Sequence, residues 1–99
     1  MIARIWRGAV RRGEADRYVD YLHATGIPAY RATPGNRGAW ILRSDRGELT
    51  EFVTLSFWDS IESVRAFAGS DPDRAVFYPE DEHFLVERDL HVTHYELID

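Results

Sequence analysis

The sequence predicts an α+β fold in which a four-stranded antiparallel sheet carries its helices on one face. Leu49–Ala68 reads as a strand that runs directly into a helix, because its hydrophobic residues change from alternation to helical spacing at Trp58–Ser60. Asp45–Gly47 reads as a three-residue hairpin turn, with Gly47 supplying a positive φ, so this strand pairs antiparallel with the one before it. The remaining segments supply a further helix and two further strands.

Local signals set the bounds of the elements. The predicted elements are strand Ile2–Gly8, helix Glu14–Thr25, loop Pro28–Arg37, strand Gly38–Ser44, strand Leu49–Trp58, helix Asp59–Ala68 and strand Leu90–Ile98. Gly26 and Pro28 should end the first helix, which makes the loop after it a mobile rim of any pocket. Asp59 should cap the second helix, and Ser70–Pro72 should open a short helix that runs to about Phe77. This order is the ferredoxin-like β-α-β-β-α-β arrangement.

Both faces of the predicted sheet are hydrophobic. The strand at Leu49–Trp58 carries Phe52 and Trp58 on one face and Val53, Leu55 and Phe57 on the other. Two helices cover only one face of such a sheet, so the second face needs another cover. A second copy of the same sheet provides it, and we therefore expect a homodimer formed through the sheet face. A bare second face would leave a large aromatic patch in water.

Composition excludes several classes of function. The chain has 99 residues, which predicts one domain over residues 1–99. It has no cysteine and no lysine, which excludes thiolate metal sites, thiol nucleophiles and Schiff-base chemistry. A net charge of −5 argues against a nucleic-acid partner. No segment is apolar enough to cross a membrane, and the charged start of the chain is unlike a signal peptide, so we expect a cytoplasmic protein.

Candidate site residues lie mainly in the last third of the chain. Imidazole titrates near neutral pH, which makes His94 the best candidate for a general base in a closed pocket. Tyr78 is the candidate phenol donor, and His83 could line the mouth of the pocket. Candidate pocket walls are Trp6, Phe57, Trp58 and Phe67. His91 and His94 point to opposite faces of a regular strand, so no metal site is predicted.

Four segments carry a family resemblance. These are the opening MIARIWRG, the run PGNRGAWILR, the strand-to-helix run FVTLSFWDSIESVRAFAG and the closing HYELI. Together they resemble the antibiotic biosynthesis monooxygenase family, which belongs to the dimeric α/β-barrel superfamily. The resemblance implies a ferredoxin-like protomer, a homodimer formed sheet to sheet, and a pocket between sheet and helices in each protomer.

The resemblance also implies possible activities. Some members of the family oxidise hydrophobic aromatic compounds with oxygen and no cofactor, which is the function expected here. The alternative is a non-catalytic dimeric protein that binds a ligand or acts in a stress response. Haem-degrading members use an Asn, a Trp and a His at places that correspond to Arg7, Phe67 and Phe77 in this chain. All three residues differ, so haem degradation is disfavoured.

Overall fold

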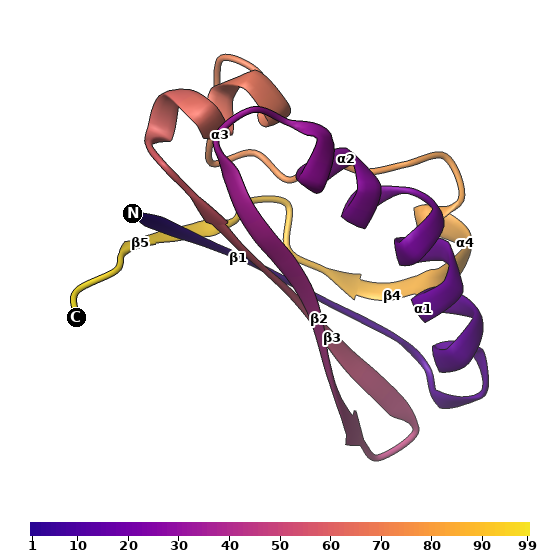
Figure 1. Ribbon diagram of the computed structural model, residues 1–99. Helices are drawn as coiled ribbons and strands as arrows, with labels where there is room; N and C mark the ends of the chain where they lie inside the picture. The colour runs from indigo at the N-terminus through magenta and orange to yellow at the C-terminus, as the bar shows by residue number, and fades with distance from the viewer.

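An antiparallel sheet with its helices on one face forms the body of the molecule (Figure 1). The computed structural model describes residues 1–99. Its elements are β1 (Ile2–Arg11), a 3₁₀ turn (Arg12–Glu14), α1 (Ala15–Ala24), α2 (Gly26–Ala32), β2 (Asn36–Arg46), β3 (Leu49–Trp58), α3 (Ile61–Ala68), α4 (Asp81–Phe84), β4 (Leu85–Arg88) and β5 (Thr93–Glu96). The strands run in the order β2-β3-β1-β4, and β5 also pairs with β1. The predicted α+β, ferredoxin-like class is confirmed. No helix is long and apolar enough to span a membrane.

The last part of the sheet differs from the prediction of one strand at Leu90–Ile98. β5 pairs with β1 at Ile2–Ile5, whereas β4 pairs with it at Gly8–Val10. Between them, residues 90–92 leave the ladder, and Leu90 and Val92 form backbone hydrogen bonds with Ala75 and Asp73. Two short strands therefore share one edge of β1, because this connecting segment has another partner.

The predicted short helix after Ser70–Pro72 does not form. Residues 69–80, called the strap below, contain no helix and only one isolated bridge, between Arg74 and His91. The Asp71 carboxylate accepts the backbone N–H of Asp73 at 3.1 Å, which makes a turn of this sequence instead of a helix start. The strap then leads into α4.

The segment predicted as the loop Pro28–Arg37 begins with a helix, α2. Pro28 is the third residue of that helix, where its backbone nitrogen has no helical partner to lose. Thr25, with φ −125° and ψ −83°, breaks the path between α1 and α2. As a result Tyr30 is held in the core by a helix instead of lying in a mobile rim.

Two local predictions, a helix N-cap and a hairpin turn, lie close to the observed positions but do not match them. The N-cap of α3 is Ser60 and not Asp59: the Ser60 hydroxyl accepts the backbone N–H of the third residue of the helix. Asp59 is instead paired with Arg37, at 2.6 Å. The hairpin turn holds only Gly47 and Glu48, with Gly47 at φ 62°, as the first position of a type II′ turn requires.

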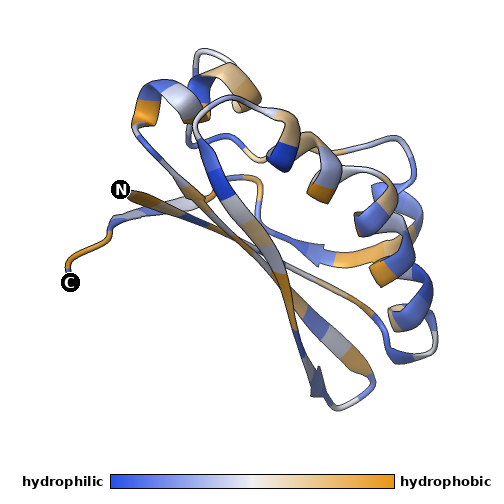
Figure 2. Cartoon of the chain, viewed as in Figure 1, coloured by the Kyte–Doolittle hydropathy of each residue, from blue (hydrophilic) through white to orange (hydrophobic).

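The two faces of the sheet have different surroundings. On β3, the side chains of Phe52, Thr54, Ser56 and Trp58 are buried beneath the helices, and their neighbours in sequence are half-buried on the opposite face. We call this second face the open face. Its hydrophobic residues are Ala3, Ile5, Ala9, Trp40, Leu42, Leu49, Val53, Leu55, Phe57 and Tyr95. Hydrophobic residues mark strands and helices alike (Figure 2), as expected for a sheet that is apolar on both sides.

Candidate functional site

A small cavity lies between the sheet and helices α1 and α2, beneath the strap. Its volume is about 20 Å³, which holds roughly one water molecule. The sheet contributes Arg4, Trp6 and Thr54, the segment between β4 and β5 contributes Val92, and the strap and α4 contribute Val76, Phe77, Tyr78 and Asp81. The helices contribute Tyr18, Leu22, Gly26, Ile27 and Tyr30. Hydrophobic and aromatic side chains with a few buried polar groups are typical of small-molecule sites.

Arg4 is the only cationic side chain in the cavity wall. It lies on the helix-facing side of β1 and is 1% exposed. Its Nη1 donates to the carbonyl of Pro72 at 2.5 Å, and its Nη2 donates to the carbonyl of Arg74 at 3.0 Å. Its Nε has no hydrogen-bond partner, and no carboxylate pairs with it. Burial lowers the pKa of Arg4, because removal from water disfavours the charged form.

His94 lies behind Arg4 and outside the cavity wall. Its Nε2 is 3.1 Å from Nη1 of Arg4, and its Nδ1 is 2.9 Å from the Asp73 carboxylate. A guanidinium only donates, so Nε2 accepts and Nδ1 carries the hydrogen that is donated to Asp73. Burial lowers the pKa of His94 and nearby Arg4 lowers it further, whereas Asp73 raises it. The nitrogen that a general base would need therefore already accepts a hydrogen bond from Arg4.

Asp81 ties the strap to α1. Its carboxylate is 4% exposed, and it accepts the Tyr18 hydroxyl at 2.9 Å and the backbone N–H of Tyr78 at 2.7 Å. Burial raises the pKa of Tyr18, and the nearby Asp81 carboxylate raises it further. Across the cavity, the Tyr30 hydroxyl lies 3.3 Å from Oγ1 of Thr54. These contacts fix the polar groups of the wall.

Two of the predicted site residues reach the cavity. Trp6 lines it, and its indole N–H donates to the carbonyl of Asp89 at 2.9 Å. Tyr78 also lines it, and burial raises the pKa of the Tyr78 phenol. His83 is exposed on α4 and lines no pocket.

The other predicted walls lie elsewhere. The Phe67 ring is 4.6 Å from the ring of Tyr30 and, with the fully buried Trp58, packs behind the cavity. Phe57 is on the open face against Trp40, at 5.8 Å, so its assignment to the pocket wall is wrong. Alternation along a strand separates two faces but does not say which one the helices cover.

Sequence reasoning missed three residues of the wall. Arg4 had a signal, because a charged residue on the same strand face as Trp6 faces the core. Tyr30 was hidden in a segment predicted as a loop. Asp81 was missed because it lies between Glu80 and Glu82, and nothing in the local sequence distinguishes the buried carboxylate from these exposed neighbours.

Comparison with known proteins identifies a family. Residues 1–77 match the family of antibiotic biosynthesis monooxygenases. No curated protein sequence matches the chain. The matched residues include β1, both helices of the β1–β2 connection, the hairpin and α3, and they end within the strap.

Solved structures share the fold along nearly the whole chain. Rv0793 of Mycobacterium tuberculosis is 24% identical, with a TM-score of 0.66, over 99% of this chain and 95% of that one. A Bacillus cereus protein named for the antibiotic biosynthesis monooxygenases is 18% identical, with a TM-score of 0.68, over 96% and 89%. The heme-degrader MhuD of M. tuberculosis, solved with two hemes in its active site, is 20% identical, with a TM-score of 0.59, over 99% and 96%. At such identities the likeness establishes the shared fold.

Proposed function

Because the chain belongs to the antibiotic biosynthesis monooxygenase family, we propose that it oxidises a small aromatic compound with dioxygen in the cavity between sheet and helices. The observation that carries the proposal is the aromatic lining of this cavity, in which Trp6, Tyr18, Tyr30, Phe77 and Tyr78 surround a few buried polar groups. Such a lining favours a flat apolar ring and excludes water from it.

The proposed reaction takes all its electrons from the substrate. A phenol with a free para position and one dioxygen give a para-quinone and one water: one oxygen atom becomes the new carbonyl and the other leaves as water with the two displaced hydrogens. The balanced reaction needs no cofactor. The protein would contribute orientation of the ring, hydrogen bonds to its oxygen and a dry cavity.

Entry of a substrate requires the strap to move. The cavity of about 20 Å³ is too small for an aromatic ring as it stands. Val76, Phe77 and Tyr78 form the side of the wall that has neither helix nor strand, and all three are half-buried. Outward movement of these residues would open the cavity and would break the hydrogen bond from the Tyr78 backbone to Asp81.

Oxygen uptake with 1-naphthol tests the proposal. We expect one dioxygen to be consumed and one 1,4-naphthoquinone to be formed per naphthol, above the rate without protein. Val92→Phe places a ring in the cavity and should reduce the rate by about tenfold or more, at a cost in stability of about 1–3 kcal/mol. Val86→Phe, at an exposed position on β4, is the matched control. No uptake above the blank, or equal loss in both variants, would contradict the proposal.

Binding without turnover is the second candidate function. One observation favours it: the cavity offers no free basic side chain, because both Asp81 oxygens already accept hydrogen bonds and His94 faces Arg4. In that case 1-naphthol should quench tryptophan fluorescence, with no oxygen consumed.

The residues around the cavity do not fit a haem. No histidine lines it: His23, His83 and His91 are exposed, and both ring nitrogens of His94 are engaged. A haem iron would therefore find no imidazole ligand here. Titration with hemin should produce no Soret band beyond that of free hemin, and a sharp shifted band would overturn this conclusion.

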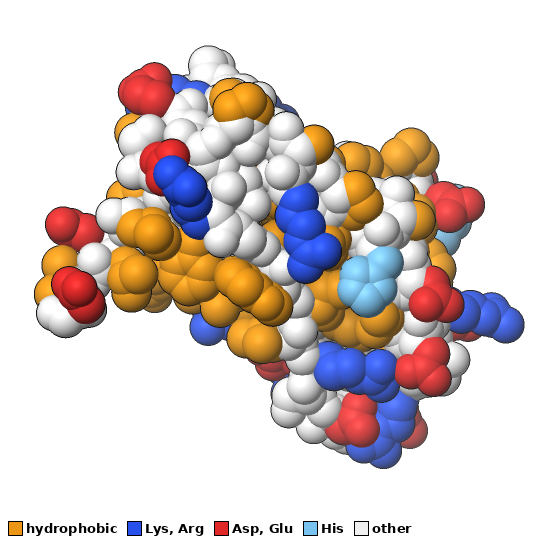
Figure 3. All heavy atoms as spheres, viewed as in Figure 1, with side chains coloured by type: hydrophobic (Ala, Val, Ile, Leu, Met, Phe, Trp, Pro, Cys, Tyr) orange, Lys and Arg blue, Asp and Glu red, His pale blue; other side chains and the backbone are white.

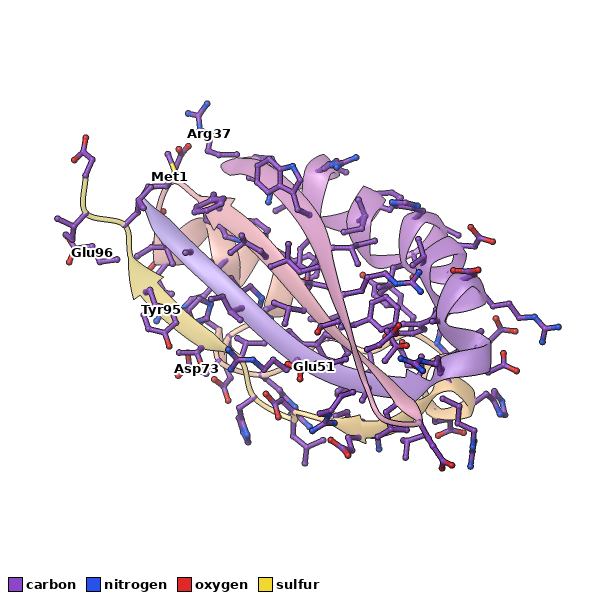
Figure 4. The ribbon with its side chains drawn as sticks, turned by 90° about the horizontal axis from the view of Figure 1, so that it is seen from below. Met1, Arg37, Glu51, Asp73, Tyr95 and Glu96 are labelled. Atoms are coloured by element: carbon purple, nitrogen blue, oxygen red, sulfur yellow. The ribbon has the colours of Figure 1, made fainter.

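We also propose that the functional unit is a homodimer formed through the open face. Trp40 and Tyr95 are 49% and 55% exposed on this face, and Figure 4 looks onto it, with Tyr95 and Glu51 marking β5 and β3. In the view of Figure 1, hydrophobic side chains gather at the surface on the left and centre of the molecule, near the C-terminal end (Figure 3). A patch of this kind is typical of a protein interface. A cytoplasmic location is part of the proposal and is testable by cell fractionation.

A further inference from the structure

We infer that the cavity binds aromatic anions, with the ring among the aromatic side chains and the negatively charged oxygen on the guanidinium of Arg4. The inference uses the cavity of the proposed function but requires binding alone, not turnover. It therefore specifies the substrate class of that function and also holds for a protein that only binds its ligand.

A buried charge without a counter-ion carries the argument. Arg4 is 1% exposed and forms no ion pair. Its protein partners are two backbone carbonyls, a neutral imidazole and the ring of Phe67, whose centroid lies 5.7 Å from the guanidinium carbon. None of these groups bears a full negative charge. Burying a charge is costly unless the charge is paired, so folded proteins rarely keep one in this state without a reason. An anionic ligand would complete the pair.

The guanidinium also keeps hydrogen-bonding capacity for a ligand. The N–H of Arg4 Nε is buried and has no partner, and only one of the two N–H groups on Nη2 is used. Adjacent N–H groups of a guanidinium match the oxygen atoms of a carboxylate, and one of them suffices for a phenolate. A ligand oxygen would thus satisfy an orphaned donor without displacing Pro72 or Arg74.

The acidic side chains near Arg4 do not neutralise it. Asp73 reaches it only through His94, whose Nδ1–H the carboxylate accepts, and Asp73 is exposed to water. Asp81 lines the same cavity, but its two oxygens are taken by Tyr18 and by the backbone of Tyr78. His94 and Asp73 therefore act as positioning residues that hold the guanidinium against the cavity wall.

The negative net charge of the chain means that only a local cation can cause a preference for anionic ligands. At −5, the protein as a whole repels anions, so any preference for an anion over its neutral analogue must come from a local cation. The ring is recognised by the aromatic lining, where it can stack or pack edge to face. Carboxylates and phenolates share the required chemistry, namely an aromatic ring bearing an anionic oxygen.

Matched pairs of probes test the inference on the unaltered protein. Benzoate is compared with neutral benzamide, and 4-nitrophenol with nitrobenzene, at neutral pH. The readouts are the NMR shift of the Trp6 indole N–H and, for 4-nitrophenol, the visible absorbance of its phenolate. We expect at least one anion to bind about tenfold or more tightly than its neutral partner. Benzoate alone indicates a carboxylate ligand, 4-nitrophenolate alone a phenolate, and both indicate the whole class.

Two variants locate the charge that is responsible. Arg4→Met should remove the preference for the anion, whereas Arg7→Met, on the same strand but on the open face, should keep it. If Arg4→Met fails to fold, the probe pairs on the unaltered protein still decide whether an anion is preferred, and Arg4→Lys, which keeps the charge but not the planar donors, should weaken benzoate binding. Equal binding of anion and neutral analogue, or equal losses in Arg4→Met and Arg7→Met, would overturn the inference.

The experiment separates this inference from the proposed oxidation. Anion binding with no oxygen uptake would leave the inference standing and refute the oxidation. Oxygen uptake with 1-naphthol, together with no preference for anions in either probe pair, would do the reverse.

Discussion

A chain of three polar residues, Asp73, His94 and Arg4, connects the surface to the cavity. The sequence singled out His94 for its chemistry, but its role depends on which atoms face it, and that is set by pairing between β5 and β1 and by the turn that holds Asp73. These contacts join residues about 20 and 90 positions apart along the chain. No local pattern could have revealed that the imidazole accepts a hydrogen bond from a buried arginine.

His94 should make stability depend on pH. Its ordinary pKa is 6.5 and its folded pKa is lower, so the unfolded state takes up a proton first as the pH falls. The free energy of unfolding should therefore decrease as the pH falls from 6.5 through the lower folded pKa of His94. His94→Gln, which still accepts from Arg4 but does not titrate, should flatten this part of the curve.

Urea denaturation between about pH 5 and pH 8 measures the effect. His23→Gln, at an exposed histidine on α1, is the control and should leave the slope unchanged. Parallel curves for the unaltered protein and His94→Gln would show that His94 does not resist protonation in the folded state.

Elements with a strong local pattern were predicted well. β3 spans Leu49–Trp58 as expected, because its bounds follow the alternation of hydrophobic residues. α3 ends at Ala68 as expected, because helical spacing stops there and Gly69 follows with φ 94°. The strap and the split last strand were not predicted, since their conformation comes from backbone hydrogen bonds between residues 73–75 and 90–92. α2 was missed because Pro28 is a breaker in a helix interior but not in a first turn.

Gly35 should be essential where α3 meets the start of β2. Its φ is 90°, and a Cβ there would lie 2.2 Å from Oγ of Ser63 on α3. Gly35→Ala should therefore destabilise the protein by about 2–3 kcal/mol, combining left-handed strain with a steric clash. Gly47→Ala has a positive φ but open space and should cost only about 1 kcal/mol. Gly13→Ala has neither feature and should stay within about 0.5 kcal/mol.

Thermal or urea denaturation of the three variants separates the cost of backbone strain at a positive φ from the cost of the steric clash with Ser63. Equal losses in Gly35→Ala and Gly47→Ala would mean that the contact with Ser63 relaxes at no cost.

At the scale of the whole molecule, the sheet has one face covered by helices and one face without a cover. The sequence predicted that both faces are hydrophobic. The helix-covered face of β3 carries the polar residues Thr54 and Ser56, which made it look like the less buried face, so Phe57 was assigned to the wrong side. The open face also divides along its length. Most of its hydrophobic residues lie toward the start of β1, whereas the ion pairs Arg7–Glu51 and Arg46–Glu87 lie toward the hairpin.

The proposed dimer should use the hydrophobic half of the open face. Leu97 and Ile98 continue this surface beyond β5, where the chain runs away from the body of the protein and Ile98 is 75% exposed (Figure 1). A stable interface buries about 800 Å² on each partner, which a sheet face of this kind can supply. Leu55, between Ile5 and Trp40 in the sheet register, lies at its middle.

Leu55→Glu should therefore convert the protein to a monomer. A two-fold interface would bury the new carboxylate of both protomers among apolar side chains, and neither carboxylate would have a partner of opposite charge. Light scattering after size exclusion should give twice 11.5 kDa for the unaltered protein and 11.5 kDa for the variant. Leu90→Glu, at an exposed leucine between β4 and β5, is the matched control and should remain a dimer. A monomeric unaltered protein at high concentration would refute the dimer, and a dimeric Leu55→Glu would move its interface off the open face.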